Sequence, residues 1–354
     1  MKNFNEVAGK AKRVFTYVFL IAGALFFNAG ICSDDDPLDD LDDDGGGSAA
    51  GTWTMYNTDN GYPGGRVKDI AVDTKNNVWI ASENGLHKYD GTTWTTFDKT
   101  TGLPSNDISM VAADGNGNIL IEIGSTTMIY DGKTWKDISL KRGNGDPIRL
   151  SSNVIRTPDG HLWTNADWYY LERGIAHWNG TSWSVTSDGA GDWSHTSFAY
   201  DASGDVWYTR GYGAYGTTGE AGGLYKIGDS GPTLARSYSL YNLSIDSKGN
   251  KWMTWGSTLI KLASDNKTLT DYSKEKVSDE FELTGIGFTL VDDKDNLWTS
   301  LNRLDPRLVK YDGKKWTFYP GPENVQGMGG IVAMDSKGVL WIAGFDYVYS
   351  FKTK

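Results

Sequence analysis

A seven-residue motif, Asp-x-x-Gly/Asn-x-x-Trp, returns along this chain about once every 44 residues. Its tryptophan position is filled seven times, by Trp79, Leu120, Trp163, Trp207, Trp252, Trp298 and Trp341. The successive gaps of 41, 43, 44, 45, 46 and 43 residues match the length of one four-stranded propeller blade. The spacing therefore predicts an all-β fold, a single β-propeller of seven four-stranded blades.

Residues 67–98 show one period most clearly, because four short β-branched and aromatic runs alternate there with turn residues. We name these runs strands A, B, C and D, outward from the ring axis. The A–B turn carries an Asp six residues before the Trp position in every period except the third, where Thr157 stands. These residues are Asp73, Asp114, Asp201, Asp246, Asp292 and Asp335. Each carboxylate is expected to accept backbone N–H groups of its own turn, with structural calcium binding as the weaker alternative.

A second motif, Tyr-Asp-Gly-x-x-Trp or a near copy, marks the turns between strands C and D, because Asp-Gly and Asn-Gly favour tight hairpins. Its tryptophans are Trp94, Trp135, Trp183 and Trp316. Blades four and five lack this Trp, and Leu234 and Leu269 are expected to take its place. Most of the fifteen tryptophans are accordingly predicted to pack blade against blade.

The two ends of the repeat region predict how the ring closes. Residues 52–56 read as a strand D that precedes any strand A. The last repeat supplies strands A, B and C over residues 331–335, 340–344 and 347–352, and then the chain ends. We therefore predict that the N-terminal strand completes the seventh blade.

The repeats resemble those of the two-component-regulator propeller family. The resemblance is carried by residues 73–82, Gly85-Leu86, Tyr89-Asp90-Gly91 and residues 102–106, and it extends over about residues 52–354. It implies a propeller of the kind that forms the extracytoplasmic sensing part of hybrid histidine kinases, commonly as two rings followed by a β-sandwich. This chain has one ring and neither kinase helices nor a receiver domain, which makes signalling by this polypeptide alone doubtful.

The first 32 residues have the pattern of a secretory signal peptide. Four basic residues precede an uncharged, largely apolar run at residues 14–27, and Cys32, the only cysteine, follows shortly after. Cys32 is therefore a candidate lipidation site of a bacterial lipoprotein. Ile31 departs from the small residue usual before such a cysteine, so an uncleaved membrane anchor over residues 14–32 is the alternative.

Residues 33–51 predict a disordered tether. Eight Asp fall within residues 34–44, and a Gly-, Ser- and Ala-rich stretch follows. Like charges at this density repel one another and cannot pack a core. An acidic run directly after a lipidated cysteine is similar to the signal that exports some lipoproteins to the outer face of the outer membrane. We therefore expect a propeller at residues 52–354, anchored to the outer membrane and facing the cell exterior.

The charge balance argues against a polyanionic partner. The chain has 34 basic and 45 acidic residues, of which the first fifty residues hold four and nine. The propeller thus carries a net charge of −6 without a basic stripe. This pattern makes nucleic acid an unsuitable partner, and it equally disfavours direct adhesion of the ring to an anionic membrane.

Long loops with exposed aromatic residues are the candidate ligand-binding region. In a propeller the D–A and B–C connections share one face, where ligands usually bind. The long connections of blades three and four should bring one aromatic and charged cluster together there. Its members are Trp168, Tyr169, Tyr170, Arg173, Trp193, His195, Arg210, Tyr212 and Tyr215. Aromatic faces stack on sugars while charged groups bind hydroxyls, although such side chains can also simply cover the ring.

The sequence predicts no catalytic residue, no metal site and no cofactor. The four histidines form no metal-binding or nucleophile motif. Trp255, Arg303, Asp305 and Arg307 are secondary binding candidates. The leading prediction is a non-catalytic binding scaffold for a glycan or a cell-surface protein. The alternatives are a polysaccharide or cyclic-peptide lyase or hydrolase, in which His195 could serve as a general base, and a sensing partner of a separate two-component system.

Overall fold

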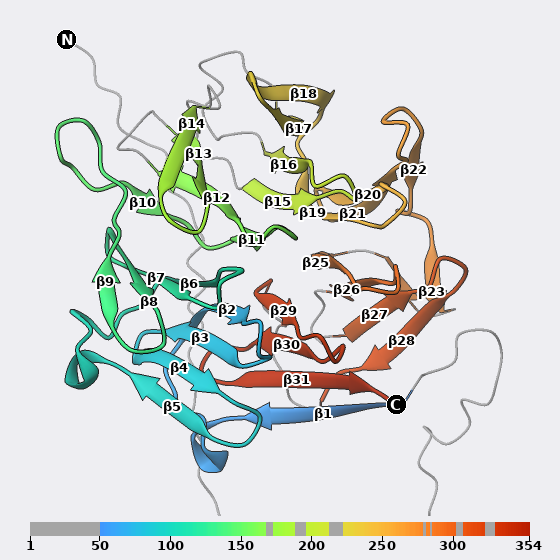
Figure 1. The fold of residues 1–354 in the computed structure, drawn as a ribbon. Helices are drawn as coiled ribbons and strands as arrows, with labels where there is room; N and C mark the ends of the chain where they lie inside the picture. Colours follow the sequence, from blue (N-terminus) through green and yellow to red (C-terminus); the bar gives the residue numbers. More distant parts are fainter. Residues whose placement is uncertain are drawn as a thin grey trace, which may run out of the picture. The chain divides into compact units, whose positions relative to one another are not determined.

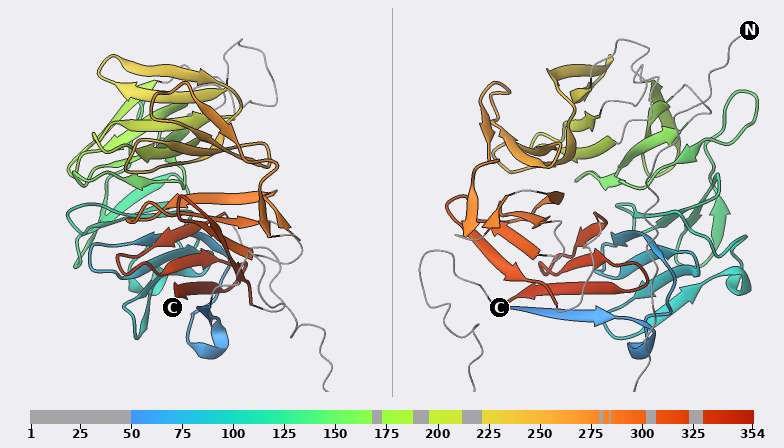
Figure 2. Two further views of the ribbon diagram at one scale, coloured as in Figure 1. Left: turned by 90° about the vertical axis from the view of Figure 1, so that its right-hand side faces the viewer. Right: turned by 180° about the vertical axis from the view of Figure 1, so that it is seen from behind.

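The computed structural model describes residues 50–167, 173–187, 196–211, 222–278, 281–283, 285–301, 307–322 and 330–354. Seven of the antiparallel sheets that these residues form are blades arranged in a ring, as predicted, and one further sheet is a separate two-stranded pair (Figure 1). Figure 2 shows the ring from the side and from behind. No helix among the described residues is long and apolar enough to cross a membrane, and residues 14–32 lie outside the described part.

Each blade is a four-stranded meander whose strand A lines the ring axis. Blade one contains β2 (Val67–Val72), β3 (Val78–Ser82), β4 (Gly85–Tyr89) and β5 (Trp94–Phe97). Blade two contains β6 (Met110–Ala113), β7 (Ile119–Ile123), β8 (Thr126–Tyr130) and β9 (Trp135–Asp137). Blade three has its inner strand in two pieces, β10 (Arg149–Leu150) and β11 (Ile155–Arg156), followed by β12 (Leu162–Asp167), β13 (Arg173–Trp178) and β14 (Trp183–Ser187).

The next three blades follow the same order. Blade four contains β15 (Thr196–Tyr200), β16 (Val206–Arg210), β17 (Gly223–Gly228) and β18 (Gly231–Ser237). Blade five contains β19 (Tyr241–Ile245), β20 (Lys251–Trp255), β21 (Thr258–Leu262) and β22 (Leu269–Asp271). A small pair, β23 (Lys276–Ser278) and β24 (Phe281–Glu282), precedes blade six, which contains β25 (Ile286–Val291), β26 (Leu297–Leu301), β27 (Arg307–Tyr311) and β28 (Trp316–Pro320).

Blade seven joins the two ends of the ring and confirms the predicted closure. Its strands are β29 (Val332–Met334), β30 (Leu340–Ala343), β31 (Val348–Thr353) and the N-terminal β1 (Gly51–Tyr56). The register of β1 on β31 runs from Gly51 opposite Thr353 to Tyr56 opposite Val348. Two 3-10 turns follow the first two outer strands, η1 (Thr58–Asn60) and η2 (Lys99–Thr101), and each begins with a capping box.

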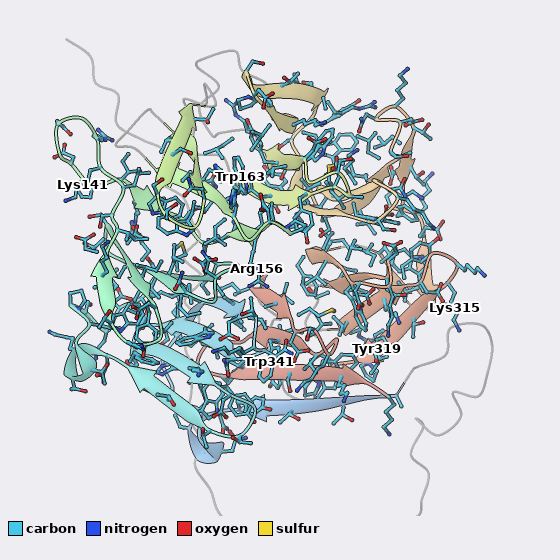
Figure 3. All side chains as sticks on the ribbon, in the orientation of Figure 1. Lys141, Arg156, Trp163, Lys315, Tyr319 and Trp341 are labelled. Atoms are coloured by element: carbon cyan, nitrogen blue, oxygen red, sulfur yellow. The ribbon has the colours of Figure 1, made fainter. Side chains whose placement is uncertain are left out.

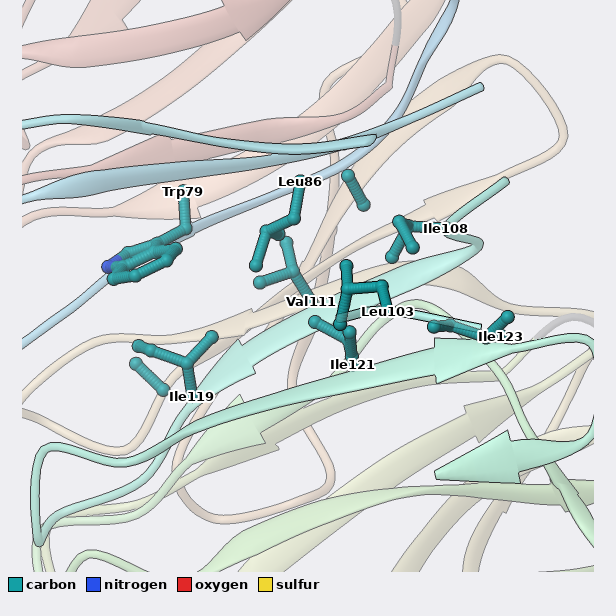
Figure 4. Close-up of a cluster of buried hydrophobic side chains, with 10 residues drawn as sticks. Trp79, Leu86, Leu103, Ile108, Val111, Ile119, Ile121 and Ile123 are labelled. Atoms are coloured by element: carbon teal, nitrogen blue, oxygen red, sulfur yellow. The ribbon is translucent and has the colours of Figure 1, made fainter. Parts of the chain in front are cut away.

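The core consists of apolar clusters between neighbouring blades. Between blades one and two, Trp79 and Leu86 pack against Val111 and Ile121, all at most 3% exposed (Figure 4). Burying such side chains contributes roughly 1.5–3 kcal/mol each before conformational entropy is counted. The ring is thus held together by the faces of its blades.

The repeated Asp and Trp form a hydrogen-bonded box in the A–B turn. In blade one, Asp73 Oδ1 accepts the backbone N–H groups of Lys75 and Asn77 at 2.8 and 2.9 Å. Its Oδ2 accepts the Trp79 indole N–H at 2.9 Å and the Asn77 side-chain amide at 2.7 Å. The prediction that this Asp caps its own turn is therefore confirmed. The carboxylate also fixes the indole, which the sequence pattern alone did not indicate.

One of the two residues that we expected at the tryptophan position of strand D does not lie there. Leu269 lies opposite Leu262, which is the register that Trp94 has opposite Tyr89. In blade four, however, Leu234 pairs with Tyr225 and is 45% exposed, whereas Pro232 lies opposite Ile227. The reason is a shorter hairpin, in which Gly228 already pairs with Gly231.

Candidate functional site

The antiparallel strand order gives the ring two different faces. The A–B and C–D turns lie on one face, which we call the turn face. The D–A and B–C connections lie on the other, which we call the loop face. Loops on a rigid scaffold can vary without disturbing the core, so the loop face is the first place to look for a binding site.

Most of the predicted aromatic cluster falls outside the described residues. This applies to Trp168, Tyr169, Tyr170, Trp193, His195, Tyr212 and Tyr215. The strand ends that flank these segments are described. Asp167 pairs with Arg173, and Arg210 pairs with both Thr196 and Gly223. All these ends lie on the loop face of blades three and four, where the predicted segments attach.

Arg210 is the one member of that cluster whose side chain is described. It is only 5% exposed. Its guanidinium lies over the ring of Tyr225, with Cζ 5.5 Å from the ring centroid, and Nη1 donates to the Tyr225 hydroxyl at 3.5 Å. Arg210 thus lies beneath the surface and supports the end of β16.

An exposed aromatic pair lies beside these strand ends. Trp255 ends β20 and is 52% exposed, and Tyr238, in the connection from blade four to blade five, is 40% exposed. Their ring centroids are 5.6 Å apart with an interplanar angle of 50°. The guanidinium of Arg236 lies 5.4 Å from the centre of the Tyr238 ring.

Backbone contacts hold this pair to the scaffold. The Tyr238 N–H donates to the carbonyl of Gly222 at 3.0 Å, so Tyr238 is joined to the residue just before β17. Trp255 pairs with Thr258 across the tight B–C turn of blade five. The sequence singled out Trp255 only as a secondary candidate and missed Tyr238. Tyr238 comes directly after a predicted strand D, and this position in the repeat was the signal that could have identified it.

A second exposed aromatic residue lies elsewhere on the loop face. Phe345, in the B–C turn of blade seven, is 66% exposed. The guanidinium of Arg66 lies 5.4 Å from the ring centroid of Phe345, and the Val67 N–H donates to the Phe345 carbonyl at 3.0 Å.

The other secondary binding candidates belong to blade six. The guanidinium of Arg307 lies 5.0 Å from the ring centroid of Phe318, while Arg303 and Asp305 lie outside the described residues.

The ring axis is hollow and lined by the inner strands. Two adjoining cavities of about 680 and 260 Å³ share Asn153, Val154, Gly330 and Val332 in their walls. Ser197, Asn242 and Thr289 line the larger cavity, and Asp69 and Arg156 line the smaller one. Figure 3 shows Arg156 at the inner side of the ring. Its Nη1 donates to the carbonyl of Ala113 at 3.3 Å.

Two buried carboxyl groups join blade two to its neighbours. Asp69 Oδ2 accepts the Val111 N–H at 3.0 Å, and Glu122 Oε1 accepts the Leu150 N–H at 3.2 Å. Burial raises the pKa of each carboxyl to about 7, although the backbone N–H groups act in the opposite direction. At Ser197 a hydroxyl has this linking role and accepts the Leu243 N–H at 3.1 Å.

The described histidines are not arranged for acid–base chemistry at the loop face. His87 is fully buried and contacts the hydroxyls of Ser82 and Thr96, each at 3.0 Å, and burial lowers its pKa to about 4. His161 and His177 lie at the turn face of blade three. Within the described ranges, no three His, Cys, Asp or Glu side chains are grouped as ligands of a metal ion.

No protein-family model matches the chain, and no curated protein matches its sequence. Solved structures do share its fold. The extracellular domain of a protein described as a hybrid two-component system from B. thetaiotaomicron gives a TM-score of 0.64 at 16% identity, covering 86% of this chain and 41% of that one. Catalytically inactive virginiamycin B lyase from Staphylococcus aureus, with quinupristin, gives 0.63 at 12% identity, covering 86% of this chain and 100% of the lyase.

A third similar structure is PorZ, an essential bacterial surface component of the type-IX secretion system of Porphyromonas gingivalis. It gives a TM-score of 0.61 at 17% identity and covers 80% of this chain and 46% of PorZ. The chain therefore spans less than half of PorZ and of the two-component protein. At these identities the likeness shows the fold alone, which hosts unrelated functions.

Proposed function

We propose that this protein is a lipid-anchored, surface-exposed protein whose propeller is a non-catalytic scaffold that binds a glycan on its loop face. One observation carries the proposal, the exposed pair of Tyr238 and Trp255 with Arg236 beside it. Ring faces stack on the apolar faces of sugars, and a guanidinium donates hydrogen bonds to hydroxyls. Exposed aromatic rings in contact with each other mark a binding surface more often than isolated ones do.

The pair also adjoins the region that the sequence singled out. Tyr238 is hydrogen-bonded to Gly222, and Gly222 follows the segment that contains Tyr212 and Tyr215. The sequence predicts aromatic ligand-binding residues in that segment, and its described end, Gly222, is in contact with the exposed pair. A glycan with more than one sugar unit fits the described pair, because each of the two rings can stack on one unit.

The position of the chain end supports the proposed orientation. Strand β1 begins at the turn face, where Gly51 pairs with Thr353 near the C-terminus (Figure 1). A tether from a lipidated Cys32 would therefore enter the ring at the turn face. The loop face is the opposite end of the ring, so the attachment point of the tether would leave it free for ligands.

The similar structures support an extracytoplasmic role without specifying a ligand. They include the extracellular domain of a protein described as a hybrid two-component system and a surface component of a secretion system. A role as the sensing partner of a separate two-component system is consistent with that likeness. A lyase or hydrolase would be favoured by a Glu or Asp within reach of His195 or by a Tyr hydroxyl at the central funnel, and His195 lies outside the described residues.

The test is a glycan-array screen of the soluble propeller, residues 50–354. The Trp255→Ala and Tyr238→Ala variants are screened in parallel, and Phe345→Ala is the matched control, since Phe345 is an exposed aromatic residue elsewhere on the same face. The proposal predicts specific binding that both variants weaken and the control retains. Specific glycan binding that neither variant weakens would show that the glycan does not bind at Tyr238 and Trp255.

Two further outcomes separate the alternatives. A blank array with well-folded protein would contradict glycan binding and favour a cell-surface protein partner. Conversion of a bound glycan into shorter products, abolished in His195→Ala, would contradict the non-catalytic role and favour a lyase or hydrolase.

A further inference from the structure

Blade three keeps the Trp of the A–B box, Trp163, but replaces its three other side chains. In blades one, five and six the box consists of an Asp, an Asn four residues later, the Trp, and a Lys on strand C that lies over the Trp ring. The lysine nitrogens of Lys88, Lys261 and Lys310 lie 5.2–5.5 Å from the ring centroids of Trp79, Trp252 and Trp298. In blade three, Thr157, His161 and His177 stand at the positions of the Asp, the Asn and the Lys.

The two histidines point at each other. His177 Nε2 lies 2.9 Å from His161 Nδ1, and Asp159 Oδ2 lies 3.2 Å from the same His161 nitrogen. The His177 ring is stacked on Trp163, with centroids 4.0 Å apart and an interplanar angle of 11°. Trp163 is labelled in Figure 3. Strand pairing and stacking thus fix His177, while His161 remains partly exposed at 33% of its side chain.

From this geometry we propose that His161 and His177 form a binding site for a divalent transition-metal ion, with Cu²⁺ as the strongest binder. Two nitrogens bound to one ion at about 2.0 Å and at a right angle lie about 2.8 Å apart, close to the observed separation. Imidazole nitrogen suits Cu²⁺, Ni²⁺ and Zn²⁺, and Cu²⁺ binds most tightly among them. The Asp159 carboxylate lies close enough to interact with the ion or with a water bound to it.

Binding of the ion needs one proton to move. In the hydrogen-bonded pair, one imidazole N–H donates to the facing nitrogen of the other ring. When the ion binds, that proton moves to the outer nitrogen of the same ring, and both facing nitrogens become free to act as ligands. With two protein nitrogens bound, further coordination positions are left for water.

The test is a Cu²⁺ titration of the full chain, followed by electron paramagnetic resonance. The decisive variant is Thr157→Asp/His161→Asn/His177→Lys, which restores the box of the other blades and is therefore expected to fold. His161→Asn alone serves as a second variant, and His195→Asn, which removes a histidine outside the pair, is the control. The parent and all variants contain the acidic tether, so any Cu²⁺ that the tether binds contributes equally to each titration.

The proposal predicts one site per chain with hyperfine structure from two nitrogens. The triple variant and His161→Asn should lose this signal and at least about tenfold in affinity, whereas His195→Asn should keep both. Equal binding by the parent and the triple variant, or a spectrum without two nitrogens, would show that the pair is only a hydrogen bond.

Discussion

Trp53 of the first strand packs against Phe351 of the last, with ring centroids 4.6 Å apart. Trp53 also donates its indole N–H to the carbonyl of Pro320 in blade six at 2.9 Å. One side chain near the start of the ring therefore joins the end of the chain to the preceding blade. The fold closes through side-chain packing as well as through the pairing of β1 with β31.

This closure predicts that removing β1 destabilises the whole ring. A protein of residues 57–354 should melt at least about 5 °C below one of residues 50–354, because it loses the strand hydrogen bonds and the buried part of Trp53. Differential scanning calorimetry of the two proteins measures the difference. Coincident melting curves would contradict closure by the N-terminal strand.

The A–B box predicts that not all of its aspartates contribute equally. Asp73→Ala removes four hydrogen-bond interactions, including that of the Trp79 indole. Asp335 accepts two backbone N–H groups, and the buried indole N–H of Trp341 has no hydrogen-bond partner among the described residues. Asp73→Ala should therefore cost about 1–3 kcal/mol more than Asp335→Ala in denaturant unfolding. Equal losses would show that the indole bond contributes nothing.

The same box predicts sensitivity to acid. Burial raises the pKa of Asp73, but the hydrogen bonds from Trp79 and Asn77 outweigh it and lower the pKa overall. A lowered pKa stabilises the fold above the unfolded value near pH 3.8, and this stability is lost as the pH falls further. Asp73→Asn should therefore flatten the loss of stability between pH 5 and pH 2. An unchanged pH profile would contradict an ionised Asp73.

Glu122 predicts a pH dependence of opposite sign. Burial raises its pKa to about 7, against the effects of Thr127, Leu150 and Arg149. Its contribution is present in full below the unfolded pKa near 4.5 and is lost as the pH rises through about 7. In Glu122→Gln the amide oxygen can accept the Leu150 N–H and the amide NH2 can donate to the Thr127 hydroxyl. The variant should therefore stabilise the protein by about 1–3 kcal/mol at pH 8 and much less at pH 5.

Glu275→Gln is the matched control for this prediction, because Glu275 is exposed. Unfolding in urea at the two pH values measures all three proteins. If Glu275→Gln raised the free energy of unfolding at pH 8 as much as Glu122→Gln, or if Glu122→Gln did not raise it, a destabilising charge on Glu122 would be contradicted.

The predicted anchor can be tested through Cys32. Cys32→Ser should prevent lipid attachment, so that labelled palmitate is no longer incorporated. The measurement compares label incorporation and membrane fractionation of parent and variant. Unchanged incorporation would contradict lipidation at Cys32, and an unlabelled parent in the membrane fraction would favour the uncleaved anchor over residues 14–32.

The sequence predicted the features that depend on neighbours in the chain. Asp73 and Trp79 are six residues apart across a single A–B turn, so the turn that they share could be predicted from the repeat. The extra strand D at the N-terminal end of the repeat region predicted the closure. Leu234 was misplaced because hairpin length, which sets the register, varies between blades. The link from Glu122 to Leu150 and the contact of Tyr238 with Trp255 join different blades, and a repeat pattern carries no information on such contacts.

The proposed site on the loop face binds a glycan through Trp255. The most direct measurement is a calorimetric titration of the best array ligand into the parent propeller, Trp255→Ala and Phe345→Ala. Loss of a stacked ring should raise Kd about tenfold in Trp255→Ala, equivalent to about 1.4 kcal/mol, and leave Phe345→Ala unchanged. Equal Kd values in the parent and Trp255→Ala would contradict the account.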